Sequence, residues 1–301
     1  MRKRYDVIVV GGGAAGVSAA VYAKRYGLSV LLISKNIGGL AADAHIICNL
    51  ITYEEIKGVE FMQKLKTQLE YLNIETVYDE VYHIKRKTGV FEVGTESSKY
   101  RSGYLIIATG GEKRKLNVPG ENELLGKGVS YCTTCDAALF KNKVVGVAGG
   151  SDAATTSALL LSEFAKKIYI IYRRGKLRGE YAWIEKVLSS PKIKVIYNAK
   201  VIALRGKEKL EYAELDNGKT LKLDGIFVEI GIVPKTELVK DLGVKVDKNG
   251  YIITDNKQKT SVKGVYAAGD VTNSELKQII TAACQGALAA YDVYNEVKKT
   301  T

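Results

Sequence analysis

The stretch DVIVVGGGAAG at residues 6–16 decides the fold of this chain. Its apolar, β-branched first half predicts a buried strand, and the small residues after the glycines predict a helix through about Tyr26. A second apolar strand, SVLLIS at 29–34, comes next. In the pattern G-x-G-x-x-G, the first glycine permits a tight turn, the second lets the backbone approach a pyrophosphate, and the third lets helix and strand pack closely. The helix N-terminus adds N–H groups and a positive dipole end. The stretch therefore predicts a dinucleotide-binding fold.

The same arrangement recurs later in the chain. The strand KVVGVA at 143–148 precedes a second glycine turn at 149–154, a helix through about Phe164 and the strand KKIYIIY at 166–172. Apolar runs that alternate with helices imply parallel sheets covered on both faces. The predicted fold class is α/β, with two Rossmann-like dinucleotide-binding domains.

The second domain is expected to be inserted in the first. The segments at 105–120 and 230–236 have the composition of extended hinges, whereas GVYAAGDV at 264–271 and the helix TAACQGALAAYDVY at 281–294 can complete the first domain. The expected domain bounds are 1–112 with 237–301 for the first domain, and 113–236 for the inserted one.

Composition excludes several classes of protein. Of 301 residues, 46% are hydrophobic and 26% are charged, which argues against disorder. No segment approaches the roughly 18 to 20 apolar residues of a membrane span, and the short apolar run after the basic N-terminus is better explained as a strand than as a signal peptide. The net charge of +12 is compatible with nucleic acid, anionic membranes, phosphate-bearing ligands or an acidic partner, but the positive residues are scattered. We expect a cytoplasmic protein with a solvated cationic surface and no nucleic-acid or membrane partner.

The sequence Cys132-Thr133-Thr134-Cys135-Asp136 carries the strongest chemical signal. In a reducing compartment such a close pair is typical of redox or metal-binding function. A zinc site would need two more ligands, and the remaining cysteines and histidines are unpaired along the sequence, so we expect no metal. A purely structural pair is a further alternative. A helix that starts at the first cysteine would lower a thiol pKa, and Asp136 could carry protons to and from that thiol.

The second glycine turn differs from the first in two ways. Ser151 occupies the middle glycine position, where its Cβ holds the backbone further from a pyrophosphate. After the following strand, Arg173 and Arg174 stand where an acid would bind a ribose, and guanidinium groups bind a 2′-phosphate with two parallel hydrogen bonds. This favours NADPH over NADH, with a solvated basic loop as the alternative.

Taken together, these motifs resemble those of the flavin-dependent pyridine-nucleotide disulfide oxidoreductases. Ala108-Thr109-Gly110 and GVYAAGDV are the supporting segments. The cysteine pair lies shortly before the second glycine turn, as in the low-molecular-weight thioredoxin reductases. Glutathione-reductase-like enzymes carry a wider-spaced pair soon after the first turn, where this chain has only Cys48.

The resemblance implies FAD in the first domain and NADPH in the second. Asp270 would contact the ribityl chain of FAD, and the ribose that usually meets an acid would meet a hydroxyl or backbone group at Ser34. The residues expected to contact FAD are Gly11, Gly13, Ala14, Ala15, Gly16, Ser34, Gly39, Leu40, Asn49, Thr109, Gly110, Gly269, Asp270, Lys277, Gln278 and Ile279. Those expected to contact NADPH are Gly149, Ser151, Asp152, Ala153, Arg173, Arg174 and Arg178.

The resemblance also implies the reaction. Cys135 would face the flavin, Cys132 would attack the disulfide of thioredoxin or a glutaredoxin-like protein, and Asp136 would act as acid and base. A homodimer is expected from the family alone. Lys277 and Ile232 depart from the arginine and histidine usual in the family, as does Leu50-Ile51-Thr52 from a proline-bearing turn. Two alternatives are a flavin dithiol oxidase or a disulfide reductase with another donor, and a basic nucleic-acid-binding protein that retains the fold.

Overall fold

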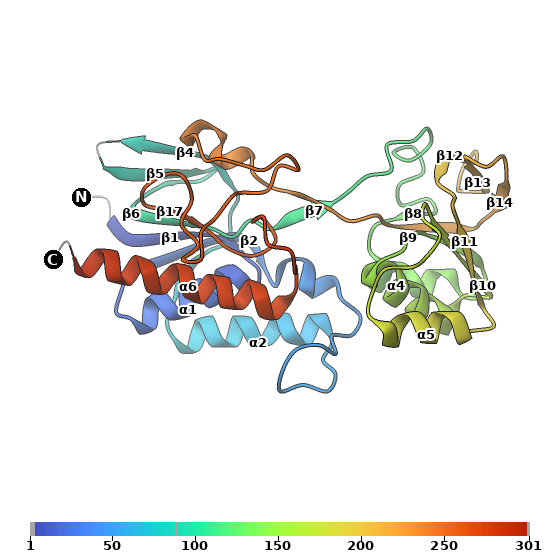
Figure 1. The fold of residues 1–301 in the computed structure, drawn as a ribbon, viewed down its shortest axis with the longest axis horizontal. Coiled ribbons are helices and arrows are strands. Elements are labelled where there is room, and N and C mark those ends of the chain that lie inside the picture. Colours follow the sequence, from blue (N-terminus) through green and yellow to red (C-terminus); the bar gives the residue numbers. More distant parts are fainter. Residues whose placement is uncertain (1–3, 88, 300–301) are drawn as a thin grey trace. The chain divides into compact units, whose positions relative to one another are not determined.

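The computed structural model describes residues 4–87 and 89–299, and the chain folds as two compact units (Figure 1). Residues up to Glu112 and from Val233 onward form unit 1, and Lys113–Ile232 form unit 2. Strands β7 (Gly111–Lys113) and β16 (Ile232–Pro234) pair with each other where the chain passes between the units. The two segments with hinge-like composition therefore run side by side.

Unit 1 is built on a sheet whose parallel part runs in the order β3-β2-β1-β6. Strand β17 continues this part beyond β6, because Val265 and Ala267 pair with Leu105 and Ile107. The parallel strands are β1 (Arg4–Gly12), β2 (Val30–Ile37), β3 (Glu75–Val77), β6 (Lys99–Ile107) and β17 (Val265–Ala267).

An antiparallel hairpin extends this sheet. Strands β4 (Val81–Lys87) and β5 (Val90–Thr95) pair with each other, and β5 pairs with the first half of β6, where Phe91 lies opposite Ser102. One edge of β6 is thus shared by β5 at its start and β17 at its end.

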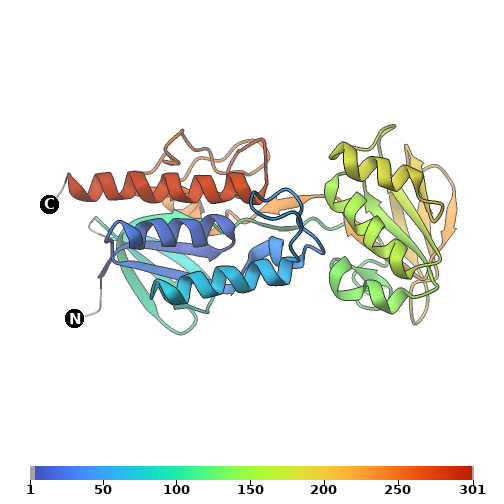
Figure 2. The same cartoon turned by 90° about the horizontal axis from the view of Figure 1, so that it is seen from below.

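Both faces of the unit 1 sheet are buried. Val7 and Val9 of β1 face one hydrophobic core, and Ile8 and Val10 face another, as the two-residue period of a strand requires. Figure 2 shows three helices side by side over one face. These helices are α1 (Ala14–Arg25), α2 (Gly58–Tyr71) and α6 (Ile279–Lys298). The short helices η1 (Gly39–Asp43) and η3 (Glu237–Leu242) also belong to this unit.

Unit 2 contains a five-stranded parallel sheet in the order β11-β10-β9-β15-β8. Helices lie on one face of this sheet and a three-stranded antiparallel sheet lies on the other (Figure 2). The parallel strands are β8 (Val129–Ser130), β9 (Val144–Gly149), β10 (Lys167–Tyr172), β11 (Ile193–Tyr197) and β15 (Gly225–Glu229). The antiparallel strands are β12 (Val201–Arg205), β13 (Tyr212–Leu215) and β14 (Thr220–Lys222). The helices are α3 (Thr133–Asp136), η2 (Ala137–Phe140), α4 (Asp152–Phe164) and α5 (Tyr181–Ser189).

The predicted α/β class with two Rossmann-like folds is confirmed. Helix α4 ends at the predicted Phe164. Helix α6 begins before and ends after the predicted 281–294. Its earlier start follows from a capping box, in which the side chains of Gln278 and Thr281 each accept a backbone hydrogen bond from the other residue. Among the described residues, none of the helices combines the length and the hydropathy that crossing a bilayer requires.

Candidate functional site

The first glycine turn joins β1 to α1. Gly11 has φ +111°, and a Cβ there would overlap the carbonyl oxygen of Ala108 at the end of β6. A Cβ at Gly16 would overlap the carbonyl oxygen of Gly11, so helix and turn are packed as closely as their backbones allow. At Gly13, by contrast, nothing lies within 4 Å of the added Cβ. The turn is therefore tight on its inner side and open beside the first N–H groups of α1.

Ser34 is held by the same turn. Its Oγ accepts a hydrogen bond from the N–H of Gly12 at 2.8 Å and donates one to the carbonyl oxygen of Asn36 at 2.7 Å. The hydroxyl proton is thus already used, and only a lone pair is left for a ribose hydroxyl.

Several residues expected at the flavin meet near this turn. Gly39 starts η1 at φ +56°, with its Cβ position 3.2 Å from Gly13 Cα. Asn49 Nδ2 donates to Gln278 Oε1 at 3.2 Å, and Gln278 is the N-cap of α6. The structure therefore brings Gly39 to the first glycine turn and Asn49 to the start of α6.

Asp270 and Lys277 form a partly buried pair of opposite charges. Burial raises the pKa of Asp270, opposed by the charge of Lys277. Burial also lowers the pKa of Lys277, whose Nζ donates to the carbonyl oxygens of Asp270 and Thr272 at 3.1 and 2.6 Å and lies 3.9 Å from the centre of the Tyr251 ring. Within the described part of the chain, the Asp270 carboxylate accepts no hydrogen bond. It is available to the hydroxyl groups of a ligand.

Thr109 and Gly110 form hydrogen bonds with Lys235, in the segment that re-enters unit 1. The Thr109 hydroxyl donates to the carbonyl oxygen of Lys235 at 2.7 Å, and the N–H of Lys235 donates to the carbonyl oxygen of Gly110 at 3.1 Å. Gly110 has φ +61° and open space at its Cβ position. The Thr109 hydroxyl has a structural bond of its own, which sequence reasoning did not anticipate.

The residues of unit 1 fit FAD. An open helix N-terminus with a close-packed glycine turn suits a pyrophosphate, and the carboxylate of Asp270 suits a polyhydroxyl chain. Bound FAD would accept two electrons from a nicotinamide and deliver them to a disulfide.

The second glycine turn joins β9 to α4. Gly149 has φ +147°, and its Cβ would overlap the carbonyl oxygen of Glu229 at the end of β15. Ser151 is the N-cap of α4 with extended backbone, but its side chain makes no capping hydrogen bond. Asp152 Oδ1 accepts the N–H of Glu180 at 2.7 Å and so holds the loop before α5. Asp152 thus has a structural bond besides its expected place at the coenzyme.

Three arginines lie on the loop that follows β10. The N–H of Arg178 donates to the carbonyl oxygen of Gly150 at 2.7 Å, which brings this loop to the glycine turn. The side chains of Arg173, Arg174 and Arg178 are exposed, and within the described residues none of them makes an ion pair or hydrogen bond. Guanidinium groups without protein partners, on a loop that is bonded to this glycine turn, suit a phosphate-bearing coenzyme.

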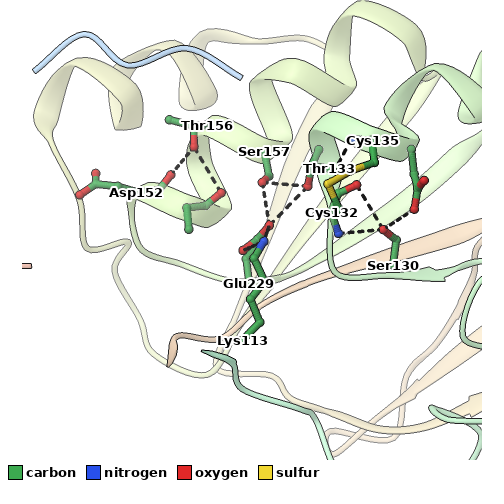
Figure 3. A network of polar contacts seen from close by, with 11 residues as sticks. Lys113, Ser130, Cys132, Thr133, Cys135, Asp152, Thr156, Ser157 and Glu229 are labelled. Atoms are coloured by element: carbon green, nitrogen blue, oxygen red, sulfur yellow. Dashed lines mark hydrogen bonds and ion pairs between the residues drawn. A yellow bond between two sulfur atoms is a disulfide. The ribbon is translucent and has the colours of Figure 1, made fainter. Parts of the chain in front are cut away.

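The two predicted redox cysteines form a disulfide. Cys132 and Cys135 are bonded to each other around the start of α3 (Figure 3). Cys132 is partly buried and is the N-cap of α3; its Sγ accepts the N–H of Cys135 at 3.2 Å. Cys135 is exposed. A donor aimed at Cys132 Sγ favours a thiolate on that sulfur once the bond is open.

Ser130, at the end of β8, connects the disulfide turn to Asp136. Its hydroxyl donates to Asp136 Oδ2 at 2.7 Å and accepts the N–H of Cys132 at 3.0 Å. The structure therefore places the expected acid–base residue beside the cysteine pair, with its orientation fixed by a serine.

Sequence reasoning missed two glutamates that hold the residues on either side of Cys132. Glu121 accepts a hydrogen bond from the Tyr131 hydroxyl and two more from the N–H groups of Leu116 and Asn117. Burial, and after it the hydrogen bond to Glu121, raises the pKa of Tyr131. The other glutamate, Glu229, has its Oε1 3.4 Å from the hydroxyl oxygen of Thr133. A charged residue inside the apolar run IFVEIGIV at 226–233 was the signal that could have found it.

The remaining cysteines, Cys48 and Cys284, are thiols and not part of a disulfide. In the part of the chain that the structure describes, no group of three or more histidine, cysteine, aspartate or glutamate side chains could hold a metal ion.

Comparison with known proteins places these observations in one family. The family model described as pyridine nucleotide-disulphide oxidoreductase matches residues 5–286. A thioredoxin reductase of Treponema pallidum is 43% identical over 298 residues, which is 97% of this chain and 96% of that protein. The crystal structure of Lactococcus lactis thioredoxin reductase superposes with a TM-score of 0.95 at 35% identity, covering 98% of this chain and 99% of that one. For the T. acidophilum thioredoxin reductase the TM-score is 0.94 at 38% identity, with 99% and 100% covered. This chain therefore belongs to the pyridine nucleotide-disulphide oxidoreductase family, in which it is a flavoprotein disulfide reductase of the thioredoxin reductase type with FAD and NADPH as its cofactors.

Proposed function

We propose that this chain reduces the disulfide of thioredoxin, or of a glutaredoxin-like protein, with electrons that NADPH supplies through FAD. The Cys132–Cys135 disulfide carries the proposal, because it lies in the same unit as the second glycine turn and its free arginines. The 43% identity to a thioredoxin reductase over nearly the whole chain supports the choice of partner.

The chain's own residues account for the exchange with the partner. The Cys132 thiolate attacks the partner's disulfide, which forms a mixed disulfide and releases one partner thiolate. Cys135 then attacks Cys132 Sγ, which restores the Cys132–Cys135 bond and releases the second partner sulfur. Asp136 lies in the helix turn that starts at Cys132 and supplies or accepts the proton, oriented by the hydroxyl of Ser130.

The coenzyme is proposed to bind unit 2 at the second glycine turn. The unused hydroxyl of Ser151 and the first N–H groups of α4 would bind the pyrophosphate. Arg173, Arg174 and Arg178 would bind the 2′-phosphate, which NADH lacks. Unit 1, which includes the first glycine turn, is proposed to hold FAD, and Asp270 and Gln278 would contact it. A cytoplasmic homodimer is proposed from the family.

A spectroscopic titration tests the proposal. The purified protein should be yellow, and anaerobic NADPH should bleach the flavin band, after which thioredoxin disulfide should be reduced catalytically. Cys132→Ser and Cys135→Ser should each retain the bleaching and lose thioredoxin reduction. Bleaching by another donor but not by NADPH would favour a disulfide reductase of different donor specificity, and rapid oxygen consumption with dithiols would favour a dithiol oxidase. A colourless protein would overturn the proposal.

A further inference from the structure

Glu229 is a buried carboxylate at the centre of a polar network under the disulfide turn (Figure 3). It is the last residue of β15, and its side chain is only 7% exposed. Its Oε1 accepts the Ser157 hydroxyl at 3.1 Å and lies 3.4 Å from the Thr133 hydroxyl. Lys113 Nζ donates to both carboxylate oxygens, at 3.0 and 3.1 Å.

One member of the network, Thr133, lies between the two cysteines in the sequence. Thr133 directly follows Cys132, is buried, and donates to Ser157 Oγ at 2.9 Å. Ser157 belongs to α4, so the network ties the Cys132–Cys135 turn to a strand end and to a long helix. Within the described residues, the side chains of this network hydrogen-bond to one another and to no sulfur, so a role in positioning fits them better than a role in the chemistry.

The ion pair with Lys113 explains how the carboxylate of Glu229 can be buried. Burial raises the pKa of Glu229, and the charge of Lys113 with the hydroxyls of Ser157 and Thr133 opposes that shift. A buried carboxylate without these partners would be costly. Glu229 is therefore an acceptor held in place by protein groups, Lys113 and Ser157, and not by solvent.

We propose that Glu229, paired with Lys113, is a positioning residue for the reacting disulfide. It acts through Thr133, whose orientation keeps Cys132 and Cys135 adjacent in the reduced turn as well as in the oxidised one. Two thiols held next to each other close a disulfide more readily than two thiols on a loose turn, because less conformational freedom is lost on closure. The network therefore favours the oxidised form of the pair. This inference deepens the proposed function and rests on it for its biological meaning.

An equilibrium with dithiothreitol tests the inference without NADPH or thioredoxin. In this exchange the two thiols of dithiothreitol give two electrons and two protons to the Cys132–Cys135 disulfide and become a cyclic disulfide. The flavin-loaded protein is equilibrated anaerobically in buffers of reduced and oxidised dithiothreitol. Free thiols are then trapped with a maleimide and counted by mass, with Cys48 and Cys284 as a constant background.

Glu229→Gln and Thr133→Val should each shift the equilibrium constant toward the dithiol by about tenfold, which corresponds to about 30 mV for two electrons. The double variant should shift it no further than either single one, because both substitutions break the same chain of contacts. Thr133→Ser, which keeps the hydroxyl, should restore most of the wild-type value.

Glu92→Gln is the matched control. Glu92 lies on β5 of unit 1, its side chain is also 7% exposed, and it is paired with Lys87 and Arg101. Its replacement should lower stability without moving the dithiol equilibrium. Equilibrium constants within twofold of wild type in both Glu229→Gln and Thr133→Val, or additive shifts in the double variant, would overturn the inference. Failure to reduce thioredoxin, with the tenfold shifts intact, would instead overturn only the proposed function.

Discussion

The two glycine turns begin alike and then diverge. Gly11 and Gly149 both have positive φ, and both lie against a carbonyl oxygen at the end of a neighbouring strand. Beyond this point unit 1 has the open Gly13 and, on its second strand, a serine whose hydroxyl is bonded inward. Unit 2 has Ser151, whose side chain makes no capping hydrogen bond, and three arginines whose guanidinium groups have no partner among the described residues. The first glycine thus serves the strand–turn–helix geometry in both units, whereas the side chains at or after the end of the second strand differ between them.

The largest effect is expected from an alanine at the first glycine of each turn. The added Cβ would collide with a strand carbonyl at a positive φ, which costs more than about 1 kcal/mol from conformation alone. Gly11→Ala should lower the flavin content of the purified protein at least tenfold, measured by absorbance. Gly149→Ala should leave the flavin in place and raise the KM for NADPH at least tenfold. Loss of flavin from both variants would mean that the turns do not serve separate ligands.

The next effect concerns the arginines. Arg173→Ala and Arg174→Ala should each raise the KM for NADPH about tenfold or more, since a charge-assisted hydrogen bond contributes about 1.5–3 kcal/mol. The KM for NADH should stay within about twofold of wild type. Steady-state kinetics with both coenzymes measures the ratio, with the exposed Lys194→Ala on β11 as a control for loss of one positive charge. Equal effects on both coenzymes would remove the 2′-phosphate assignment.

Lowering the pH should change the stabilising contributions of two buried carboxylates, Asp292 in unit 1 and Glu229 in unit 2, in opposite directions. In unit 1, burial raises the pKa of Asp292, but hydrogen bonds from Lys259 at 2.9 Å and Tyr266 at 2.7 Å bring it below its usual value. A carboxylate with a lowered folded pKa stabilises the fold above its unfolded pKa, and this stabilisation is lost as pH falls through the folded value. Asp292→Asn should therefore lower the free energy of unfolding by about 1–3 kcal/mol at pH 7, and by less near pH 3.

For Glu229 of unit 2 the folded pKa is raised. Its contribution to the free energy of unfolding is present below the unfolded pKa and decreases as pH rises through the folded pKa. Urea unfolding of Asp292→Asn and Glu229→Gln at several pH values checks both trends. If the loss of unfolding free energy caused by each substitution changes with pH in the same direction, the pKa shift of one of the two carboxylates has the wrong sign.

The smallest effect is expected at Ser34. Ser34→Ala removes the acceptor of the Gly12 N–H and should lower the free energy of unfolding by about 1 kcal/mol. Because the hydroxyl proton is already donated to Asn36, the affinity for FAD should fall by less than about threefold. Flavin release measured by fluorescence tests this, and a tenfold loss would show that the hydroxyl turns to the ribose when FAD binds.

The repeated strand–glycine–helix units could be predicted from sequence because each is local. Gly11 and Gly149 stand between a β-branched run and a small-residue helix, so spacing alone identifies both turns. The hairpin β4–β5 and the sheet β12–β14 were not predicted, because they lie outside the repeated strand–glycine–helix unit and strands such as β4 and β13 mix charged with apolar residues.

The candidate site was predictable only where its residues are close together in the sequence. Cys132, Cys135 and Asp136 lie together in the sequence, and so do Arg173 and Arg174. The bonds of Ser34 to Gly12, of Thr109 to Lys235 and of Glu229 to Lys113 join residues far apart in the chain. Such contacts depend on how strand ends meet, which no local pattern encodes.

The two glutamates that contact the neighbours of Cys132 have a consequence for protein engineering. Glu121 accepts a hydrogen bond from Tyr131, 10 residues further along the chain, and Glu229 lies beside the hydroxyl of Thr133, 96 residues earlier, so both residues that flank Cys132 contact a carboxylate outside the tetrapeptide. Grafting CTTC alone onto another scaffold would transfer the sulfurs without the supports that shape their turn. A graft that aims at the same redox behaviour should carry both glutamates, the lysine that neutralises one of them, and the strand end that presents it.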